Sequence, residues 1–372
     1  MIYLDNNATT FMHPEVKQIL IEDDLLPKNP SSIHWVGRNA RKLLEDARER
    51  LANVLSVKLG RGGYKIIFTS GGTESNNLIV NNFVDGILLY SATEHVSVRD
   101  CAANLKNSRE LKVTRDGLVD IDFLNDELKQ AGSSGGRALI SVMAANNETG
   151  VIGKIEEMSQ LAKQYGALFH TDAAQAFGKI NIDINKLGVD FVTISSHKIG
   201  GPLGIGALVV REEEMLKPIF IGGGQERGER PGTENVLGAL GFAQAAEISA
   251  KNIEKFASHT SSLRTYIENE INNTSCGMII SENSERLPNT VLIASKTLNA
   301  DLQLIQFDAE NIAVSNGSAC SSGKVKNSHV LGAMGYDDKI ANKVIRVSLS
   351  LANTMEDAKQ FVLVWKKIHK IQ

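Results

Sequence analysis

Several short polar segments carry side chains suited to chemistry, and each follows an apolar run or lies among small residues. The first, residues 69–77 (Thr-Ser-Gly-Gly-Thr-Glu-Ser-Asn-Asn), comes directly after a predicted strand and opens a predicted helix. Its glycines allow close approach of the backbone, and the N–H groups at a helix start attract an anion. The segment therefore predicts a phosphate-binding turn, although a helix start capped by Thr73 or Ser75 explains it at least as well.

Two further segments follow predicted strands. In residues 170–175 (His-Thr-Asp-Ala-Ala-Gln), Asp172 ends a strand among small residues, where a carboxylate favours the protonated form of a nearby heteroaromatic nitrogen. A cap on the following turn is an equally good interpretation of Asp172. In residues 195–202, Lys198 follows a buried run, where partial desolvation makes an amine a better nucleophile. The alternative for Lys198 is an ordinary solvated lysine.

A fourth segment, residues 315–323, places Cys320 among serines and glycines, which is typical of a loop rather than a core. The other cysteines, Cys101 and Cys276, have no comparable setting and are interpreted as structural. Three cysteines without a C-x-x-C pair argue against a disulfide framework and against a cysteine-ligated zinc. His95 and His197 lack a third ligand at metal spacing, so we expect no metal site.

The order of these segments is more informative than any one of them. A phosphate-type turn, an acid at a strand end and a lysine after the next strand meet at one edge of a parallel sheet. Pyridoxal phosphate needs these three groups: an anchor for its phosphate, a partner for its ring nitrogen and a lysine for its aldehyde.

Composition excludes several other classes of protein. The chain has 372 residues, of which 42% are hydrophobic and 22% charged, as in a soluble globular protein of two or three domains. Its formal charge of −3 provides no field that would gather nucleic acid or anionic lipid. No apolar run of about 18 residues and no secretory signal pattern is visible. A cytoplasmic location is therefore expected.

The fold class follows from the alternation of short apolar runs with amphipathic stretches. Strands are predicted at residues 65–68, 87–90, 138–143, 168–170, 191–194 and 207–210, and helices at 38–55, 74–83 and 155–165. This pattern predicts an α/β fold with a mostly parallel sheet. A long helical region at 237–272 is followed by a mixture of short strands and helices, which predicts a second, smaller α+β domain from about residue 255.

The chain resembles the NifS/IscS-type cysteine desulfurases, which are fold-type I pyridoxal-phosphate enzymes of the class-V aminotransferase family. The matching motifs run in the same order along nearly the whole chain, at residues 3–10, 29–32, 69–77, 94–95, 146–150, 170–175, 197–198, 222–228, 318–320 and 346. The resemblance implies an aspartate-aminotransferase-like fold with a seven-stranded, mostly parallel sheet. It also implies a large cofactor-binding domain at 15–255 and a small domain at 1–14 and 256–372 that carries a mobile cysteine loop.

The resemblance also implies roles for individual residues. The catalytic residues would be Cys320, which receives sulfur, Lys198, which holds the cofactor, and His95, the candidate base for the thiol. Asn147 and Arg346 would bind the substrate carboxylate. The implied cofactor-binding residues are Gly72, Thr73, His95, Asp172, Gln175, Ser195, His197, Lys198 and, from the partner subunit of a homodimer, Thr233.

The implied reaction takes sulfur from L-cysteine and leaves L-alanine and a persulfide on Cys320, for transfer to an acceptor in iron–sulfur cluster assembly or tRNA thiolation. A sulfur-acceptor or iron–sulfur scaffold protein would be the partner, without direct binding of nucleic acid or membrane. Two alternatives stay open. The first is another fold-type I enzyme such as a selenocysteine lyase or an aminotransferase, and the second is a catalytically silent scaffold.

Overall fold

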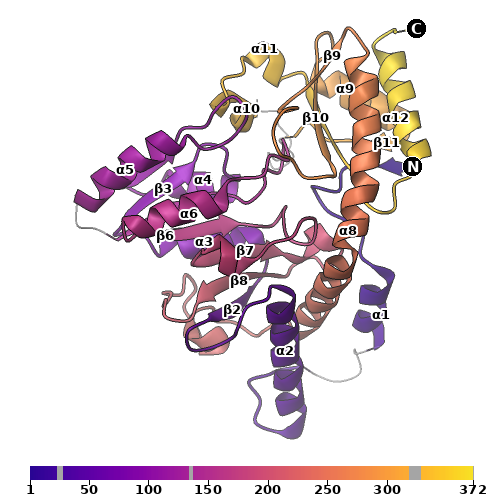
Figure 1. Ribbon diagram of the computed structural model, residues 1–372. Helices are drawn as coiled ribbons and strands as arrows, with labels where there is room; N and C mark the ends of the chain where they lie inside the picture. The colour runs from indigo at the N-terminus through magenta and orange to yellow at the C-terminus, as the bar shows by residue number, and fades with distance from the viewer. Residues whose placement is uncertain (23–27, 134–136, 318–327, 372) are drawn as a thin grey trace.

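A computed structural model describes residues 1–22, 28–133, 137–317 and 328–371. Its centre is a seven-stranded sheet in the order β2-β8-β7-β6-β5-β3-β4 (Figure 1). All pairs from β7 to β4 are parallel, and β8 is antiparallel to both neighbours. The predicted α/β class and seven-stranded sheet are confirmed. The strands are β2 (Tyr64–Thr69), β3 (Ile87–Ser91), β4 (Ser108–Leu111), β5 (Ala138–Ser141), β6 (Leu168–Asp172), β7 (Phe191–Ser195) and β8 (Gly206–Arg211).

Alternating side chains of these strands enter two separate cores, because successive residues of a strand point to opposite faces. Ile66 and Leu89 pack in one core, whereas Ile67 and Leu88 pack in the other. Helices cover both faces, so the strands are buried on both sides and read as continuous apolar runs. The first core includes α2 (Trp35–Val54), α5 (Ile121–Ser133) and α6 (Ile155–Gln164), and the second includes α3 (Gly72–Asn81) and α4 (Val96–Ala102).

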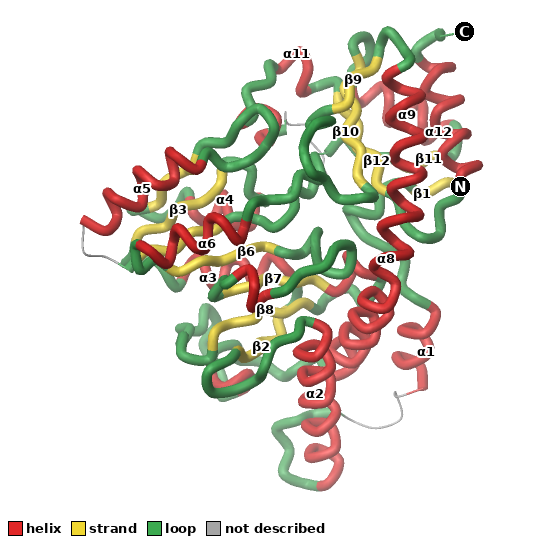
Figure 2. Tube along the Cα trace, in the orientation of Figure 1, coloured by secondary structure: helices red, strands yellow, loops and turns green. Residues whose placement is uncertain are grey.

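A second, smaller unit holds the end of the chain together with its beginning (Figure 2). Its antiparallel sheet has the order β12-β10-β9, and β1 pairs in parallel with β11. Leu4 packs in the same core as Phe361 and Trp365. The elements are β1 (Ile2–Tyr3), β9 (Gly277–Ile279), β10 (Thr290–Ser295), β11 (Ile312–Ala313), β12 (Val344–Ser348), α9 (Ala300–Ala309), α10 (His329–Ala333), α11 (Asp338–Ala341) and α12 (Met355–Ile368).

Helix α8 (Val236–Asn272) joins the two units, and α1 (Pro14–Glu22) packs beside its first half (Figure 1). Two short helices, α7 (Ile184–Leu187) and the 3-10 turn η1 (Ser196–Ile199), precede and follow β7, and η2 (Gln225–Gly228) precedes α8. We propose the domain boundaries that the family resemblance implies, 15–255 and 1–14 with 256–372. The boundary at 255 then lies inside α8.

The structure differs from the sequence predictions at two places. The apolar pattern misses strand β4, because its sequence Ser-Arg-Glu-Leu has little apolar character and the strand lies at the edge of the sheet. Neither Thr73 nor Ser75 caps α3. The N-cap is Gly71, at φ 155°, and no side chain caps the helix start. The N–H groups of this turn are therefore left for another acceptor.

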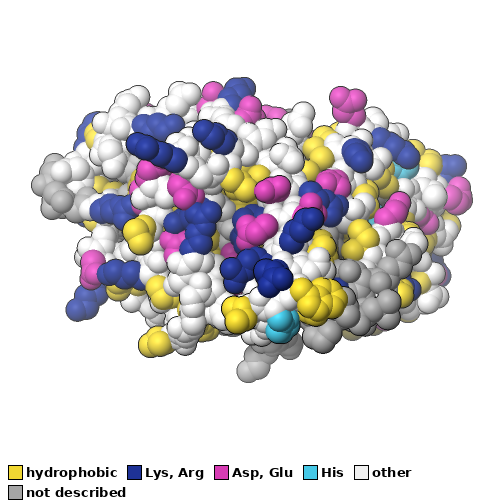
Figure 3. All heavy atoms as spheres, turned by 90° about the horizontal axis from the view of Figure 1, so that it is seen from below, with side chains coloured by type: hydrophobic (Ala, Val, Ile, Leu, Met, Phe, Trp, Pro, Cys, Tyr) yellow, Lys and Arg dark blue, Asp and Glu magenta, His cyan; other side chains and the backbone are white. Residues whose placement is uncertain are grey.

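The surface agrees with the low net charge. On the face seen from below, basic and acidic side chains lie next to one another (Figure 3). Among the described residues, no helix has both the length and the apolar composition that crossing a bilayer requires.

The contact between β8 and the start of α3 yields a test of how the phosphate-type turn is positioned. A Cβ atom at Gly206 would lie 2.8 Å from the Cα of Gly71 and 2.9 Å from the carbonyl oxygen of Ile194, and backbone atoms yield little. We expect Gly206→Ala to lower the free energy of unfolding by about 1–3 kcal/mol. Urea denaturation measures the change.

Gly332→Ala is the matched control, because nothing lies within 4 Å of a Cβ added in this helix. It should leave the protein equally stable or slightly more stable. Equal stability of both variants and the parent protein would contradict the proposed close contact.

Candidate active site

A cavity of about 550 Å³ lies where the carboxyl ends of β6 and β7 meet the N-terminal segment and β12 of the small unit. It brings together all but two of the predicted site residues. Thr233 is not among the described residues that line it, and Cys320 lies outside the described residues. The predicted residues in its lining are Gly72, Thr73, His95, Asn147, Asp172, Gln175, Ser195, His197, Lys198 and Arg346.

Lys198 lies in η1, directly after β7, and its side chain is half-buried. Its Nζ donates hydrogen bonds to the carbonyl oxygens of Asn7, at 2.7 Å, and Ala8, at 2.9 Å. These acceptors belong to the N-terminal segment, which packs on the small unit. The alternative of a merely solvated Lys198 is therefore wrong, since the amine is held at the wall of the cavity.

Asp172 ends β6 and is 7% exposed. Its Oδ1 accepts from the backbone N–H of Ala174 at 2.9 Å, so the interpretation as a cap of the following turn is confirmed. Its Oδ2 accepts from the side-chain amide of Asn76 at 2.7 Å. Because Asp172 also lines the cavity, the cap does not exclude its other predicted role, as partner of a protonated heteroaromatic nitrogen. That role stays a prediction.

The start of α3 supplies the anion-binding end of the cavity. The N–H groups after Gly71 have no side-chain cap. A Cβ atom added at Gly72 would lie at ordinary contact distances, 3.7 Å from Thr193 and 3.9 Å from Ser195. Across this turn, the hydroxyl of Ser195 is buried and has no hydrogen-bond partner among the described residues. A buried hydroxyl in that state is costly unless a ligand supplies its partner.

His197 lies beside Lys198, and its Nδ1 is 3.2 Å from the hydroxyl of Thr9. Burial lowers the pKa of His197 to about 4, and the charges of Lys198 and Lys179 act in the same direction. His197 is therefore neutral at neutral pH. It can donate one hydrogen bond toward the cavity or accept one there, but it adds no charge.

His95 caps the start of α4. Its Nδ1 accepts from the backbone N–H of Ser97 at 3.2 Å and lies 2.7 Å from the hydroxyl of the same residue. Both contacts suit the tautomer protonated at Nε2, because the Ser97 hydroxyl accepts from the Asn76 amide at 2.8 Å and can therefore donate to Nδ1. The preceding residue, Glu94, is fully buried, and burial together with the charge of Asp172 holds its pKa well above the usual range.

Arg346 extends from β12 of the small unit into the same cavity and is 2% exposed. Its guanidinium donates to the carbonyl oxygen of Asn147 at 2.9 Å and to a carboxylate oxygen of Asp5 at 2.6 Å. Its Nε is buried and has no partner in the described part of the chain. A carboxylate ligand would find here a donor group that is already oriented.

These observations test whether the site suits pyridoxal phosphate. An uncapped helix start and the unpartnered hydroxyl of Ser195 suit a phosphate. A lysine amine and a carboxylate lie in the same cavity, as the aldehyde and the ring nitrogen require. The residues present fit the cofactor.

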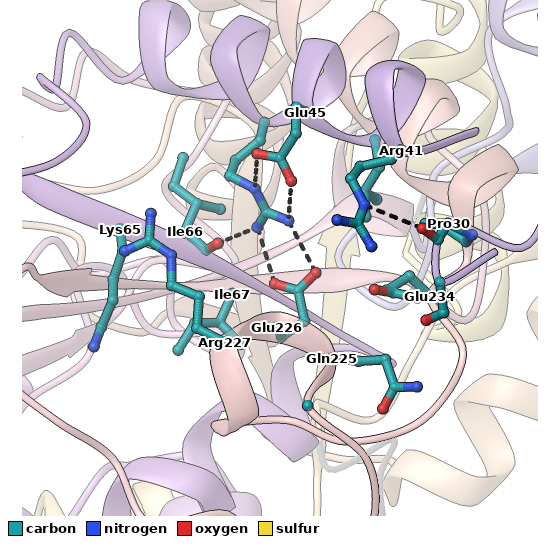
Figure 4. Close-up of a pocket in the computed structure, with 14 residues that line it drawn as sticks. Pro30, Arg41, Glu45, Lys65, Ile66, Ile67, Gln225, Glu226, Arg227 and Glu234 are labelled. Carbon is teal, nitrogen blue, oxygen red and sulfur yellow. Dashed lines mark hydrogen bonds and ion pairs between the residues drawn. The ribbon is translucent and has the colours of Figure 1, made fainter. Parts of the chain in front are cut away.

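A second cavity, of about 460 Å³, differs in character (Figure 4). Glu45 and Glu226 both turn toward the guanidinium of Arg48, which is 2.9 Å from Glu226. Arg48 also donates to the carbonyl oxygen of Ile66. Because these charged side chains pair with one another, we interpret their role as structural. The candidate catalytic residues lie in the first cavity.

Comparisons with known proteins give the family of this chain. The model of the family described as "Aminotransferase class-V" matches residues 2–361. The chain belongs to the class-V aminotransferase family. A relative in this family, "Cysteine desulfurase IscS" of Dictyoglomus turgidum, is 38% identical over 99% of this chain and 94% of its own.

Solved structures of related class-V aminotransferases have the same fold. A NifS-like protein from Rickettsia africae is 42% identical, covers 100% of both chains and superposes with a TM-score of 0.94. The structure of SspA in complex with cysteine is 30% identical over 95% of this chain and 100% of that chain, with a TM-score of 0.79.

Several residues of the site cannot be assigned a role from the sequence. Asn7 lies in the motif at residues 3–10, but its contacts with both units depend on tertiary structure. Asn76, which donates to Asp172, lies in the motif at residues 69–77. Lys179 follows Gln175 by four residues and was not noticed, because nothing in the surrounding turn marks a lysine as buried.

Burial of His170 predicts a pH dependence of stability. Its ring contacts the hydroxyls of Ser141 at 2.9 Å and Thr193 at 3.0 Å, and burial lowers the pKa of His170 to about 4. In the unfolded chain the ring titrates near 6.5, so its stabilising contribution is present above that pH and is lost as the pH falls toward 4. When the pH is lowered from 7 to 4.5, the free energy of unfolding should fall by about 2 kcal/mol less in His170→Gln than in the parent protein.

Thr193→Val is the control, because it removes one hydrogen bond of the imidazole and keeps the titrating ring. It should lower the free energy of unfolding at both pH values and retain most of the pH dependence. Equal pH dependence of His170→Gln and the parent protein, measured by urea denaturation, would show that the ring is not buried as a neutral group.

Proposed function

We propose that this class-V aminotransferase is a cysteine desulfurase, which converts L-cysteine to L-alanine and leaves a persulfide on Cys320. The main support is the single cavity where Lys198, Asp172, the uncapped start of α3 and Arg346 meet. Relatives named cysteine desulfurases match nearly the full length of the chain. The site thereby provides for a cofactor, an amino-acid carboxylate and a lysine amine together.

Pyridoxal phosphate is the proposed cofactor. Gly72, Thr73, Ser195 and His197 would hold its phosphate, together with Thr233 of a second copy. Asp172 would face the ring nitrogen, Gln175 the ring hydroxyl and His95 the ring face, and Lys198 would bind the aldehyde. When bound, the cofactor supplies an electron sink that stabilises negative charge at the α-carbon of the amino acid.

The residues of the chain then have distinct tasks. Arg346 and Asn147 orient the carboxylate of L-cysteine, and the hydrogen bond from Arg346 to the Asn147 carbonyl holds the two in register. Lys198 moves a proton through its Nζ. The carbonyl oxygens of Asn7 and Ala8 hold this amine in place at 2.7 and 2.9 Å.

Cys320 receives the sulfur, and its thiol must first lose a proton, because a free thiol is mostly protonated at neutral pH. His95 is the proposed base. Because Nδ1 accepts from the backbone N–H of Ser97 at 3.2 Å, taking up the proton at Nε2 requires the ring to change to the tautomer protonated at Nδ1. Both residues that flank segment 318–327 lie close to Glu148. A Cβ atom added at Gly317 would lie 3.3 Å from a carboxylate oxygen of Glu148, and the Ser328 hydroxyl donates to this carboxylate at 2.5 Å.

We further propose a homodimer, because Thr233 does not line the cavity of its own chain and would reach the phosphate from a second copy. The sulfur would pass to an acceptor or scaffold protein of iron–sulfur cluster assembly or tRNA thiolation. A cytoplasmic location is consistent with this role.

Mass spectrometry of Cys320 tests the proposed function. After treatment with L-cysteine, the peptide that contains Cys320 should gain the mass of one sulfur atom. With an added dithiol reductant, which reduces the persulfide to thiol and sulfide, the parent protein should release sulfide. Cys320→Ala should keep the visible absorption of the cofactor and lose this release by at least about 100-fold, because no thiol attacks the substrate sulfur.

Cys101→Ala, on α4, is the matched control and should retain sulfide release. A Cys320→Ala protein with full activity would favour an aminotransferase or a selenocysteine lyase. A parent protein without cofactor absorption would favour the scaffold alternative.

Arg346→Lys tests the carboxylate site. A lysine cannot donate two parallel hydrogen bonds, so we expect the KM for L-cysteine to rise about 10- to 100-fold. Arg264→Lys is the control, because that guanidinium binds the carbonyl oxygen of Leu287 at 2.7 Å and does not line the cavity. An unchanged KM in Arg346→Lys would exclude Arg346 from substrate binding.

A further inference from the structure

Lys179 is a second lysine at the active site, where it lies behind two residues of the cavity lining, Asn7 and Gln175. It is 3% exposed, and its Nζ donates to the side-chain oxygen of Asn7 at 2.9 Å and to that of Gln175 at 2.7 Å. No carboxylate lies within ion-pair distance of this amine in the described part of the chain. A buried lysine without an acid is expensive, so its presence calls for an explanation.

The two acceptors of Lys179 are both amides that can point either way. The oxygen and nitrogen of an amide side chain differ little in shape, so neighbours decide which of them faces the cavity. A lysine amine presents hydrogens to its neighbours, and therefore both amides turn their oxygens toward Lys179. The nitrogen of Gln175 is then directed to the carbonyl oxygen of Asn7, at 2.9 Å.

The nitrogen of Gln175 carries two hydrogens, and the bond to Asn7 uses one of them. Gln175 also lines the cavity, so the second hydrogen remains for a ligand there. The carbonyl oxygen of Asn7 accepts from Lys198 as well, at 2.7 Å. One chain of contacts thus runs from Lys179 through Gln175 and Asn7 to the Lys198 amine.

We propose that Lys179 is a positioning residue, which fixes Gln175 so that it offers a hydrogen-bond donor, rather than an acceptor, to the cofactor's ring oxygen. The inference rests on the proposed function for the identity of that ligand. A donor at this place stabilises negative charge on the ring oxygen, which a flipped amide would oppose. Lys179 itself need not touch the cofactor or the substrate.

The positive charges around Lys179 disfavour a proton on its amine. The charges of Lys198 and Arg346 act on Lys179, and its own charge acts on His197. Burial and these two cations lower the pKa of Lys179 well below its usual range. In the uncharged state the amine has two hydrogens, which matches its two acceptors.

A pH titration of the visible absorption of the full-length protein with pyridoxal phosphate bound tests the inference. The cofactor bound to Lys198 is more negative when the linkage to the lysine is deprotonated. Loss of the Gln175 hydrogen bond to the ring oxygen should therefore raise the pKa of this linkage. We expect Lys179→Met to move the midpoint upward by about one pH unit. Gln175→Leu should move it by a similar amount.

The double variant decides whether Lys179 acts through Gln175. In the Gln175→Leu background, Lys179→Met should add less than about a third of its single effect, since the two changes remove one interaction. Lys179→Arg, which also has only donors, should bring the midpoint back toward the parent value. Lys186→Met, at a lysine whose side chain is 69% exposed, is the matched control and should leave the midpoint unchanged.

An unchanged midpoint in Lys179→Met, or shifts that add fully in the double variant, would overturn the inference. Thermal unfolding checks the fold of each variant: Lys179→Met leaves the side-chain oxygens of Asn7 and Gln175 without this donor, so we expect a lower unfolding temperature but a cooperative transition. Failure of the proposed function looks different, because the parent protein would then bind pyridoxal phosphate and release no sulfur from L-cysteine. A parent protein without a cofactor band would overturn both.

Discussion

The gathering of basic side chains at and behind one cavity is the constraint on which the site depends. Lys198 and Arg346 line the cavity, and Lys179 lies behind it, where the charges of both act on its amine. Burial and mutual repulsion lower the pKa of Lys179 and of His197. Such a cavity favours anionic ligands, because a phosphate and a carboxylate relieve repulsion that the protein alone leaves in place.

The first residues of the chain connect the two units at this cavity. The side chain of Asn7 binds Thr290 of the small unit at 2.9 Å and Lys179 of the large unit at 2.9 Å, and its backbone N–H binds Ser348. Its carbonyl oxygen accepts from Lys198 and Gln175. One buried residue therefore holds the lysine, the amide and the small unit in a common frame, so a small change at Asn7 would disturb several distances at once.

Local patterns were enough to predict most elements of the fold. Continuous apolar runs identify β2, β3, β6 and β7, because both faces of the sheet are covered. Strand β4 is not identified in this way, because an edge strand with one buried side chain has no continuous apolar run. At the site, Lys198 and Asp172 were found from their positions after strands. The partners that orient them were not, since Asn7 lies 191 residues from Lys198 and no local signal encodes that contact.

Helix α8 has a mechanical consequence for the whole molecule. Its first turns are buried in the large unit up to Ala246, and Leu263, Ile267 and Ile271 pack in the core of the small unit. Thirty-seven residues make a rod of about 55 Å without a break. The stretch between the two buried parts is continuous helix rather than a loop. A rotation of one unit against the other must bend this helix, and the resistance of the helix to bending limits how far the two walls of the cavity can separate.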